Sequence, residues 1–227
     1  MRPILKYCGN HSLSDVTVSM AGKADYIGFI FTKKSRRTVT AVQVRDWLDQ
    51  VQCSGRKKLV GVFADDPVER IESVLNTVPL QVIQLHGHES PRELRLIRSR
   101  TRTTVWKALH HGVNTLEKMR AYSGSTDGYV IDTKVKGQLG GTGVTFDWES
   151  VPEYMQEASR QRVPCLIAGG VTPANIARLL AYRPDGIDIA SGIEDGFQKS
   201  SLLIRKIEEK VWDFNDQRAE RNGEKYR

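Results

Sequence analysis

The chain has 227 residues, of which 39% are hydrophobic and 27% charged, and its formal net charge is +7. This composition is typical of soluble globular proteins and excludes the disordered and fibrous classes. No apolar run approaches the roughly 20 residues that a membrane-spanning helix requires, and the N-terminal residues lack the pattern of a secretory signal, so we expect no membrane association and no export.

Short apolar runs, rich in β-branched residues, alternate along the chain with longer segments of helical character. Strands that alternate with helices favour parallel βα units. Eight units of roughly 28 residues would fill the chain, which is the size of a short α/β barrel. We therefore predict a single-domain (β/α)8 TIM barrel over residues 1–210. The predicted strands are residues 4–8, 26–31, 59–63, 81–85, 104–108, 128–132, 165–168 and 186–189.

Helix-start motifs support the same alternation. Residues 66–69 (Asp-Pro-Val-Glu) and 90–93 (Ser-Pro-Arg-Glu) have the pattern of capping boxes with proline at the first helical position. Residues 172–175 (Thr-Pro-Ala-Asn) place a similar cap one residue after two glycines. Apolar residues at helical spacing in 42–51 and 71–78 predict helices that cover a barrel.

The C-terminal residues differ from the rest of the chain. Beyond about Val211 the sequence is polar and charged. We predict that residues 211–227 form a tail, a helix extension that frays.

The three cysteines, Cys8, Cys53 and Cys165, are odd in number, widely spaced and without a CxxC pattern. This distribution argues against a disulfide framework and against a zinc site, and it favours the reducing cytoplasm.

Two basic clusters occupy residues 33–37 (Lys-Lys-Ser-Arg-Arg) and 56–58 (Arg-Lys-Lys). They are compatible with nucleic-acid binding, with a plain solvated surface or with the capture of an anionic small substrate. Single-stranded RNA would call for interleaved aromatic residues, which the clusters lack, so we expect no nucleic-acid partner.

Strand alternation selects Cys8 as a candidate base. If Leu5 and Tyr7 face the helices, Lys6 and Cys8 face the barrel interior at the strand end where barrel enzymes place their active sites. A thiol acts as a base only when ionised, its ordinary pKa is about 8.5, and the nearby Lys6 ammonium would favour the thiolate. The alternative is that Cys8 is simply a small buried residue.

Asp132 closes the apolar strand 128–132 and either caps the next loop or faces the substrate. The glycine-rich segment 133–143 that follows has the character of a loop that closes over a ligand, although such segments also serve as plain connectors.

Two further loops follow the predicted seventh and eighth strands. Barrels that bind phosphate frequently hold it there, and glycines let backbone N–H groups approach the anion closely. The candidate phosphate ligands are Gly169, Gly170, Ser191 and Gly192.

Two more side chains are candidates for substrate contacts. His86 shares a strand face with Gln84, and a histidine there is more often a hydrogen-bonded positioner than a metal ligand, so we predict no metal site. Arg37 is able to donate a planar fork to a carboxylate, or it belongs to a solvated basic turn beside Arg36.

Ordered sequence blocks make the chain resemble the phosphoribosylanthranilate isomerase family, and they cover nearly all of it up to about Ile207. These blocks are Lys6-Tyr7-Cys8-Gly9, Gly28-Phe29-Ile30-Phe31, Ser35-Arg36-Arg37, Gly61-Val62-Phe63, Gln84-Leu85-His86-Gly87, Asp132-Thr133-Lys134, Gly140-Gly141-Thr142-Gly143, Phe146-Asp147-Trp148, Ala168-Gly169-Gly170 and Ser191-Gly192-Ile193-Glu194.

The resemblance implies an Amadori rearrangement of a phosphorylated small molecule in tryptophan biosynthesis, with Cys8 as general base, Asp132 as general acid and no cofactor. It also implies phosphate binding by the two glycine loops. The sequence leaves the oligomeric state open between a monomer and a homodimer. Substrate contacts are expected from Lys6, Arg37, His86, Gly141 and Asp188, with Arg37 near the anthranilate carboxylate.

The chain also departs from the family pattern. Tyr7 stands where the family more often has isoleucine, Asn10-His11 where it often has Leu-Thr, and Arg36 where proline is common. Because Tyr7 should face the helices, we expect catalysis to be little affected. We expect the first βα loop to differ in detail.

Two other function classes remain open from the sequence. One is another phosphosugar barrel, such as a ribulose-phosphate epimerase or an indole-glycerol-phosphate synthase, whose metal-binding or lysine-rich sets are not evident. The other is a non-catalytic module that binds a phosphorylated ligand or RNA.

Overall fold

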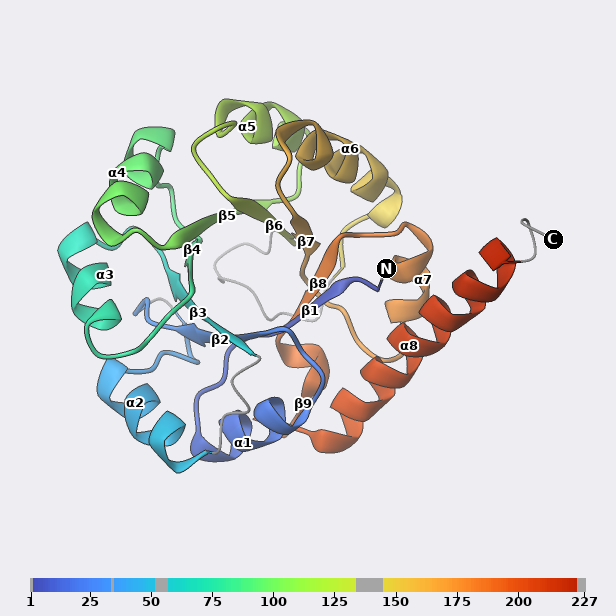
Figure 1. Ribbon diagram of the computed structural model, residues 1–227, viewed down its shortest axis with the longest axis horizontal. Coiled ribbons are helices and arrows are strands. Elements are labelled where there is room, and N and C mark those ends of the chain that lie inside the picture. The colour runs from blue at the N-terminus through green and yellow to red at the C-terminus, as the bar shows by residue number, and fades with distance from the viewer. Residues whose placement is uncertain (1, 34, 52–56, 134–144, 224–227) are drawn as a thin grey trace.

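The computed structural model describes residues 2–33, 35–51, 57–133 and 145–223. Its eight parallel strands pair in chain order and close into a barrel, as Figure 1 shows. This confirms the predicted (β/α)8 fold. The strands are β1 (Ile4–Tyr7), β2 (Tyr26–Ile30), β3 (Lys58–Phe63), β4 (Val82–Leu85), β5 (Thr104–His110), β6 (Gly128–Asp132), β7 (Cys165–Ile167) and β8 (Gly186–Ile189).

The helices form a ring outside the barrel (Figure 1). A short hairpin, β9 (Glu194–Asp195) and β10 (Gln198–Lys199), follows the last barrel strand. The α-helices are α1 (Leu13–Ala21), α2 (Ala41–Gln50), α3 (Val68–Leu75), α4 (Pro91–Thr101), α5 (Thr115–Ala121), α6 (Val151–Gln161), α7 (Ile176–Ala181) and α8 (Ser201–Gly223); the 3-10 helices are η1 (Trp148–Ser150) and η2 (Ser191–Ile193).

The helix caps agree only in part with the motifs. The capping box at Ser90 and Glu93 is present. The one expected at Asp66 is wrong, because that carboxylate accepts from the Ala64 N–H instead and α3 begins after Pro67 without a side-chain cap. Helix α7 likewise begins only after Asn175, whose side chain accepts from the backbone of residue 172.

Alternation along the strands divides the apolar residues between two layers. One set faces outward and packs under the helices, together with most of the buried apolar residues of the chain. The other forms a compact cluster inside the barrel, below the site described next. Each fully buried aliphatic side chain contributes about 1.5–3 kcal/mol to this packing. The inner cluster consists of Val60, Val82, Trp106, Ala108, Val130, Leu166 and Ala168.

Helix α8 joins the end of the chain to its beginning. The Tyr7 hydroxyl donates to Glu208 at 2.9 Å, so Tyr7 faces the helices as expected. Val211 is fully buried, and Trp212 and Phe214 pack against the same core. The helix continues beyond the ring (Figure 1). The domain boundary after residue 210 stays a prediction, but apolar packing extends past it to Phe214.

Candidate active site

A pocket lies at the carboxyl ends of the barrel strands and brings together most of the predicted site residues. Gly141 lies outside the described residues, and Lys6 is buried beneath the pocket. The predicted residues that line it are Cys8, Arg37, His86, Asp132, Gly169, Gly170, Asp188, Ser191 and Gly192.

Lys6 and Asp188 form a buried ion pair at the base of this pocket. The register of β1 and β8 sets the two residues opposite each other, and Lys6 Nζ donates to Asp188 Oδ2 at 2.8 Å. Burial lowers the pKa of Lys6, but the charges of Asp188 and Cys8 outweigh it, so the pKa is raised overall. Lys6 therefore stays an ammonium ion although it is fully buried.

Cys8 follows β1 on the same interior face. A Cβ on Gly28 would lie 2.9 Å from Cys8 Sγ and 3.3 Å from Lys6 Cε, so the absence of a side chain there makes room for both. Burial raises the pKa of the Cys8 thiol, while the charge of Lys6 lowers it and that of Asp188 raises it. Lys6 acts in the expected direction, but burial dominates and the pKa ends above its ordinary value.

Asp132 ends β6 and is 5% exposed. Burial and the charge of Asp188 raise its pKa to about 7, against the opposing effects of the Thr133 N–H and Lys6. Its Oδ1 accepts from that N–H at 2.8 Å. A carboxyl group with this pKa holds a proton in a large fraction of molecules near neutrality, and it is therefore able to act as an acid.

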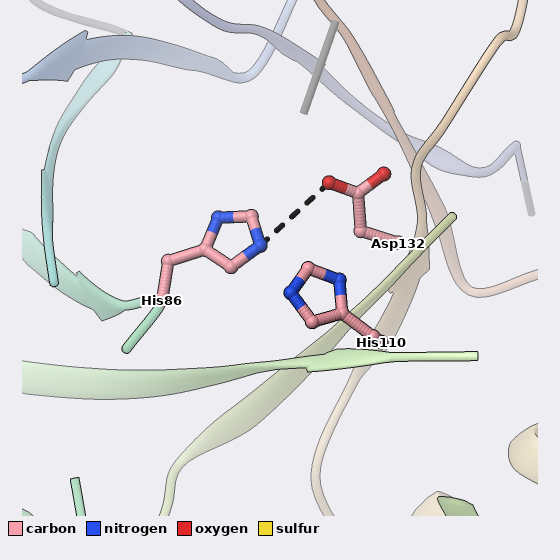
Figure 2. Close-up of side chains that lie close together, drawn as sticks. All are labelled: His86, His110 and Asp132. Carbon is pink, nitrogen blue, oxygen red and sulfur yellow. Dashed lines mark ion pairs between the residues drawn. The ribbon is translucent and has the colours of Figure 1, made fainter. Parts of the chain in front are cut away.

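Two histidines lie beside Asp132, as Figure 2 shows. His86 Nε2 is 3.6 Å from Asp132 Oδ2, and the ring centroids of His86 and His110 are 5.4 Å apart. Burial, His110 and two lysines lower the pKa of His86 to about 3, so its imidazole is neutral. His110 was not predicted as a site residue, because the predicted fifth strand ended at Ala108. Extending the same alternation by two residues would have found it.

Arg37 is only 3% exposed, which excludes the solvated basic turn. Its Nε and Nη2 donate to the two carboxylate oxygens of Glu194 at 2.9 and 2.6 Å. Lys199 Nζ donates to the same carboxylate at 2.7 Å. Glu194 was missed as a functional residue, since nothing in the sequence links it to a side chain 157 positions away.

The two glycine loops after β7 and β8 meet at the pocket. Gly169 and Gly170 have φ angles of +83° and +64°, which glycine adopts readily and other residues rarely. A Cβ on Gly192 would collide with the carbonyl oxygen of Val171. At residue 192 the two loops are thus packed so closely that only glycine fits.

Three buried side-chain atoms in the pocket wall have no hydrogen-bond partner among the described residues. They are Gln84 Oε1, His86 Nε2 and Asp188 Oδ1. A buried polar atom without a partner costs about 1–3 kcal/mol. A polar ligand that forms hydrogen bonds with these three atoms removes this cost, so the arrangement favours the binding of a polar ligand.

The basic clusters make several internal contacts. The Arg36 guanidinium lies 4.4 Å from the ring centroid of Phe197. Lys57 donates to the Ala24 carbonyl at 3.0 Å, and Lys58 Nζ lies 5.7 Å from the ring centroid of Tyr26. Arg37 is buried and Lys57 is half-buried, whereas Arg36 and Lys58 remain exposed.

Comparisons with known proteins agree with this geometry. Residues 5–210 match the family model described as "N-(5'phosphoribosyl)anthranilate (PRA) isomerase". The chain is 56% identical over 207 residues to N-(5'-phosphoribosyl)anthranilate isomerase of Geobacillus thermodenitrificans, covering 91% of this chain and 93% of the relative.

Solved structures point the same way. The phosphoribosyl anthranilate isomerase of Thermotoga maritima has a TM-score of 0.80 and 27% identity, over 93% of this chain and 99% of the other. A phosphoribosyl anthranilate isomerase in complex with reduced 1-(o-carboxyphenylamino)-1-deoxyribulose 5-phosphate has a TM-score of 0.74 and 25% identity, with the same coverage. The chain therefore belongs to the N-(5'-phosphoribosyl)anthranilate isomerase family.

Proposed function

We propose that the protein isomerises N-(5'-phosphoribosyl)anthranilate to 1-(o-carboxyphenylamino)-1-deoxyribulose 5-phosphate, a step of tryptophan biosynthesis. The observation that carries the proposal is the convergence of Cys8 after β1 and Asp132 at the end of β6 on one pocket, beside the two glycine loops. The pocket thus offers a base, an acid and an anion site around one bound sugar.

The first step opens the sugar ring. Asp132 donates its proton to the furanose ring oxygen, the C1'–O bond breaks, and the lone pair of the substrate nitrogen forms a protonated Schiff base at C1'. The pKa of Asp132, raised to about 7, makes the proton available near neutral pH.

The second step moves the double bond. The Cys8 thiolate removes the proton from C2', and the electron pair forms a C1'–C2' double bond while the iminium nitrogen becomes neutral. The resulting enolamine gains a proton at C1' and loses the one on the C2' hydroxyl, which gives the aminoketone. Because the substrate nitrogen accepts the electrons, the reaction requires no cofactor.

The remaining side chains position the substrate. Glu194 accepts hydrogen bonds from Nε and Nη2 of Arg37. The third guanidinium nitrogen, Nη1, is therefore the one that donates to the anthranilate carboxylate. Gly169, Gly170, Ser191 and Gly192 offer backbone N–H groups to the phosphate. Lys6 stabilises the Cys8 thiolate, and Asp188 and His86 bring unpaired polar atoms to the sugar hydroxyl groups.

The test is turnover by Cys8→Ala and Asp132→Asn, followed by the loss of fluorescence of the anthranilate substrate. General acid–base groups contribute about 10²–10⁴-fold each, so both variants should lose at least about 100-fold in kcat. Cys165→Ala is the matched control, because Cys165 is a fully buried thiol on β7 outside the pocket. Near-full turnover by a folded Cys8 or Asp132 variant would remove that residue from its role.

The partners follow from the same activity. The substrate is a phosphorylated small molecule, and the chain acts as a monomer or a homodimer in the cytoplasm. No helix in the described part of the chain is both long and apolar enough to cross a membrane. Light scattering of the purified protein distinguishes the monomer from the dimer.

A further inference from the structure

Three potential metal ligands converge where β4, β5 and β6 end (Figure 2). His86 follows β4 directly, whereas His110 and Asp132 are the last residues of β5 and β6 and are paired by the strand register. One ligand atom from each lies within 4.8 Å of the other two. Three neighbouring strands therefore aim two imidazoles and one carboxylate at the same point.

The distances between the three ligand atoms are close to those found around a bound metal ion. Ligand atoms on a tetrahedral Zn²⁺ lie about 3.3 Å apart when the metal–ligand distances are about 2.0–2.2 Å. The His86 Nε2–Asp132 Oδ2 distance is already 3.6 Å. All the ligand atoms lie within 4.8 Å of one another, so a closure of at most about 1.5 Å brings them to this spacing, which modest side-chain rotations supply.

The state of His86 also favours a metal. Its Nε2 atom is buried and has no hydrogen-bond partner among the described residues. An imidazole nitrogen that is buried without a hydrogen-bond partner is free to bind a transition metal when the ring proton lies on the other nitrogen. The Lys6 ammonium opposes a bound cation, but its charge is paired with Asp188 at 2.8 Å.

We propose that His86, His110 and Asp132 form a site for a divalent transition-metal ion, Zn²⁺ in particular, whose occupation inhibits the enzyme. Imidazole ligands select Zn²⁺ over Mg²⁺ and Ca²⁺, which prefer oxygen. Three protein ligands leave a fourth position to water. The bound ion removes the proton of Asp132 and occupies the space that the sugar needs. The inhibition rests on the proposed isomerase function, whereas the binding does not.

Direct binding is measured by titrating the full-length, chelator-treated protein with Zn²⁺ in a calorimeter, and with Co²⁺ as a spectroscopic probe. We expect one ion per chain and a Co²⁺ absorption typical of tetrahedral coordination. His110→Ala should weaken binding by at least about tenfold, since a directly bound ligand contributes no less than an outer-shell partner. His88→Ala is the matched control, because His88 lies just beyond β4, two residues after His86, and its side chain is 96% exposed.

Two results would overturn the site. One is equal Zn²⁺ affinity of the wild type and His110→Ala. The other is a loss of binding in Cys8→Ala but not in His110→Ala, which would assign the metal to the thiol.

The inhibition is tested separately by isomerase assays with added Zn²⁺. We expect inhibition that competes with substrate, is reversed by chelator and is weakened at least about tenfold in His110→Ala, in step with the loss of affinity. Binding without inhibition would refute the regulatory part. If the protein lacked isomerase activity altogether, the calorimetric result would still decide the site.

Discussion

Lys6 and Asp188 form an ion pair of 2.8 Å inside the barrel, where their side chains are 0% and 7% exposed. A buried pair of this kind is costly to break, because the remaining charge has neither water nor a partner.

The free energy of unfolding of the Asp188→Leu variant, measured by urea denaturation, should therefore be about 3–5 kcal/mol lower than that of the wild type. The double variant Lys6→Met/Asp188→Leu should recover much of this loss, since it removes both charges. Additive losses in the double variant would show that the ion pair does not couple the two positions.

The rate should depend on pH through Asp132 and Cys8. Catalysis requires Asp132 protonated and Cys8 ionised, although Asp132 has the lower pKa of the two, about 7, and that of Cys8 is raised. The population of this productive form rises up to about pH 7, stays level between the two pKa values and falls above that of Cys8.

Below about pH 7, the pKa of Asp132, we expect kcat/KM of the chelator-treated enzyme to fall about tenfold per pH unit. A profile that stays flat down to pH values near the ordinary pKa of an aspartate would contradict the raised pKa of Asp132.

Glu194 should act by holding Arg37. Burial raises the pKa of Glu194, but the hydrogen bonds and charges of Arg37 and Lys199 lower it overall, so the carboxylate stays ionised. Glu194→Ala frees the guanidinium to move, and KM should rise at least about tenfold with a smaller change in kcat, because the loss is one of substrate binding. Asp195→Ala, at the exposed neighbouring position, should leave both constants unchanged. A fall in kcat alone would contradict a positioning role.

Gly192 should be essential for the anion site. A Cβ at this position meets the Val171 carbonyl, so Gly192→Ala must displace one of the two loops. Inorganic phosphate should then inhibit at least about tenfold less well, the equivalent of about 1.4 kcal/mol of binding. Gly112→Ala is the control, because a Cβ there meets no atom within 4 Å. Unchanged phosphate inhibition in a folded Gly192→Ala enzyme would move the anion elsewhere.

The C-terminal helix offers a test of the domain boundary. Truncation after residue 210 removes Val211, Trp212 and Phe214, all packed on the core, and should lower the free energy of unfolding by about 3–5 kcal/mol. Truncation after residue 216 keeps these three side chains and should change stability little. Equal stability of the two truncated proteins would support the boundary predicted at 210.

Local patterns predicted the barrel well. The period-2 alternation in β1 assigned Leu5 and Tyr7 to the helices and Lys6 to the interior, because each decision depends only on neighbours in the chain. The Ser90 cap was found for the same reason. The cap at Asp66 failed, because that carboxylate binds the Ala64 N–H and the Arg70 side chain instead.

What the sequence did not predict depends on distant partners. The bond from Arg37 to Glu194 joins loops after the second and eighth strands. The pKa of Asp132 depends on burial and on Asp188, which the closed barrel brings near. Residue spacing contains no information about such pairs until the topology is known.

The hydrogen bond from Tyr7 to Glu208 spans 201 residues, and β1 pairs with β8. During synthesis, the first strand leaves the ribosome long before its neighbour on one side exists. The barrel cannot be sealed until β8 has emerged, so one edge of the growing sheet stays open while the strands before β8 are made. A protein built in this way should acquire its full resistance to proteolysis in one step, after β8 and α8 have been released.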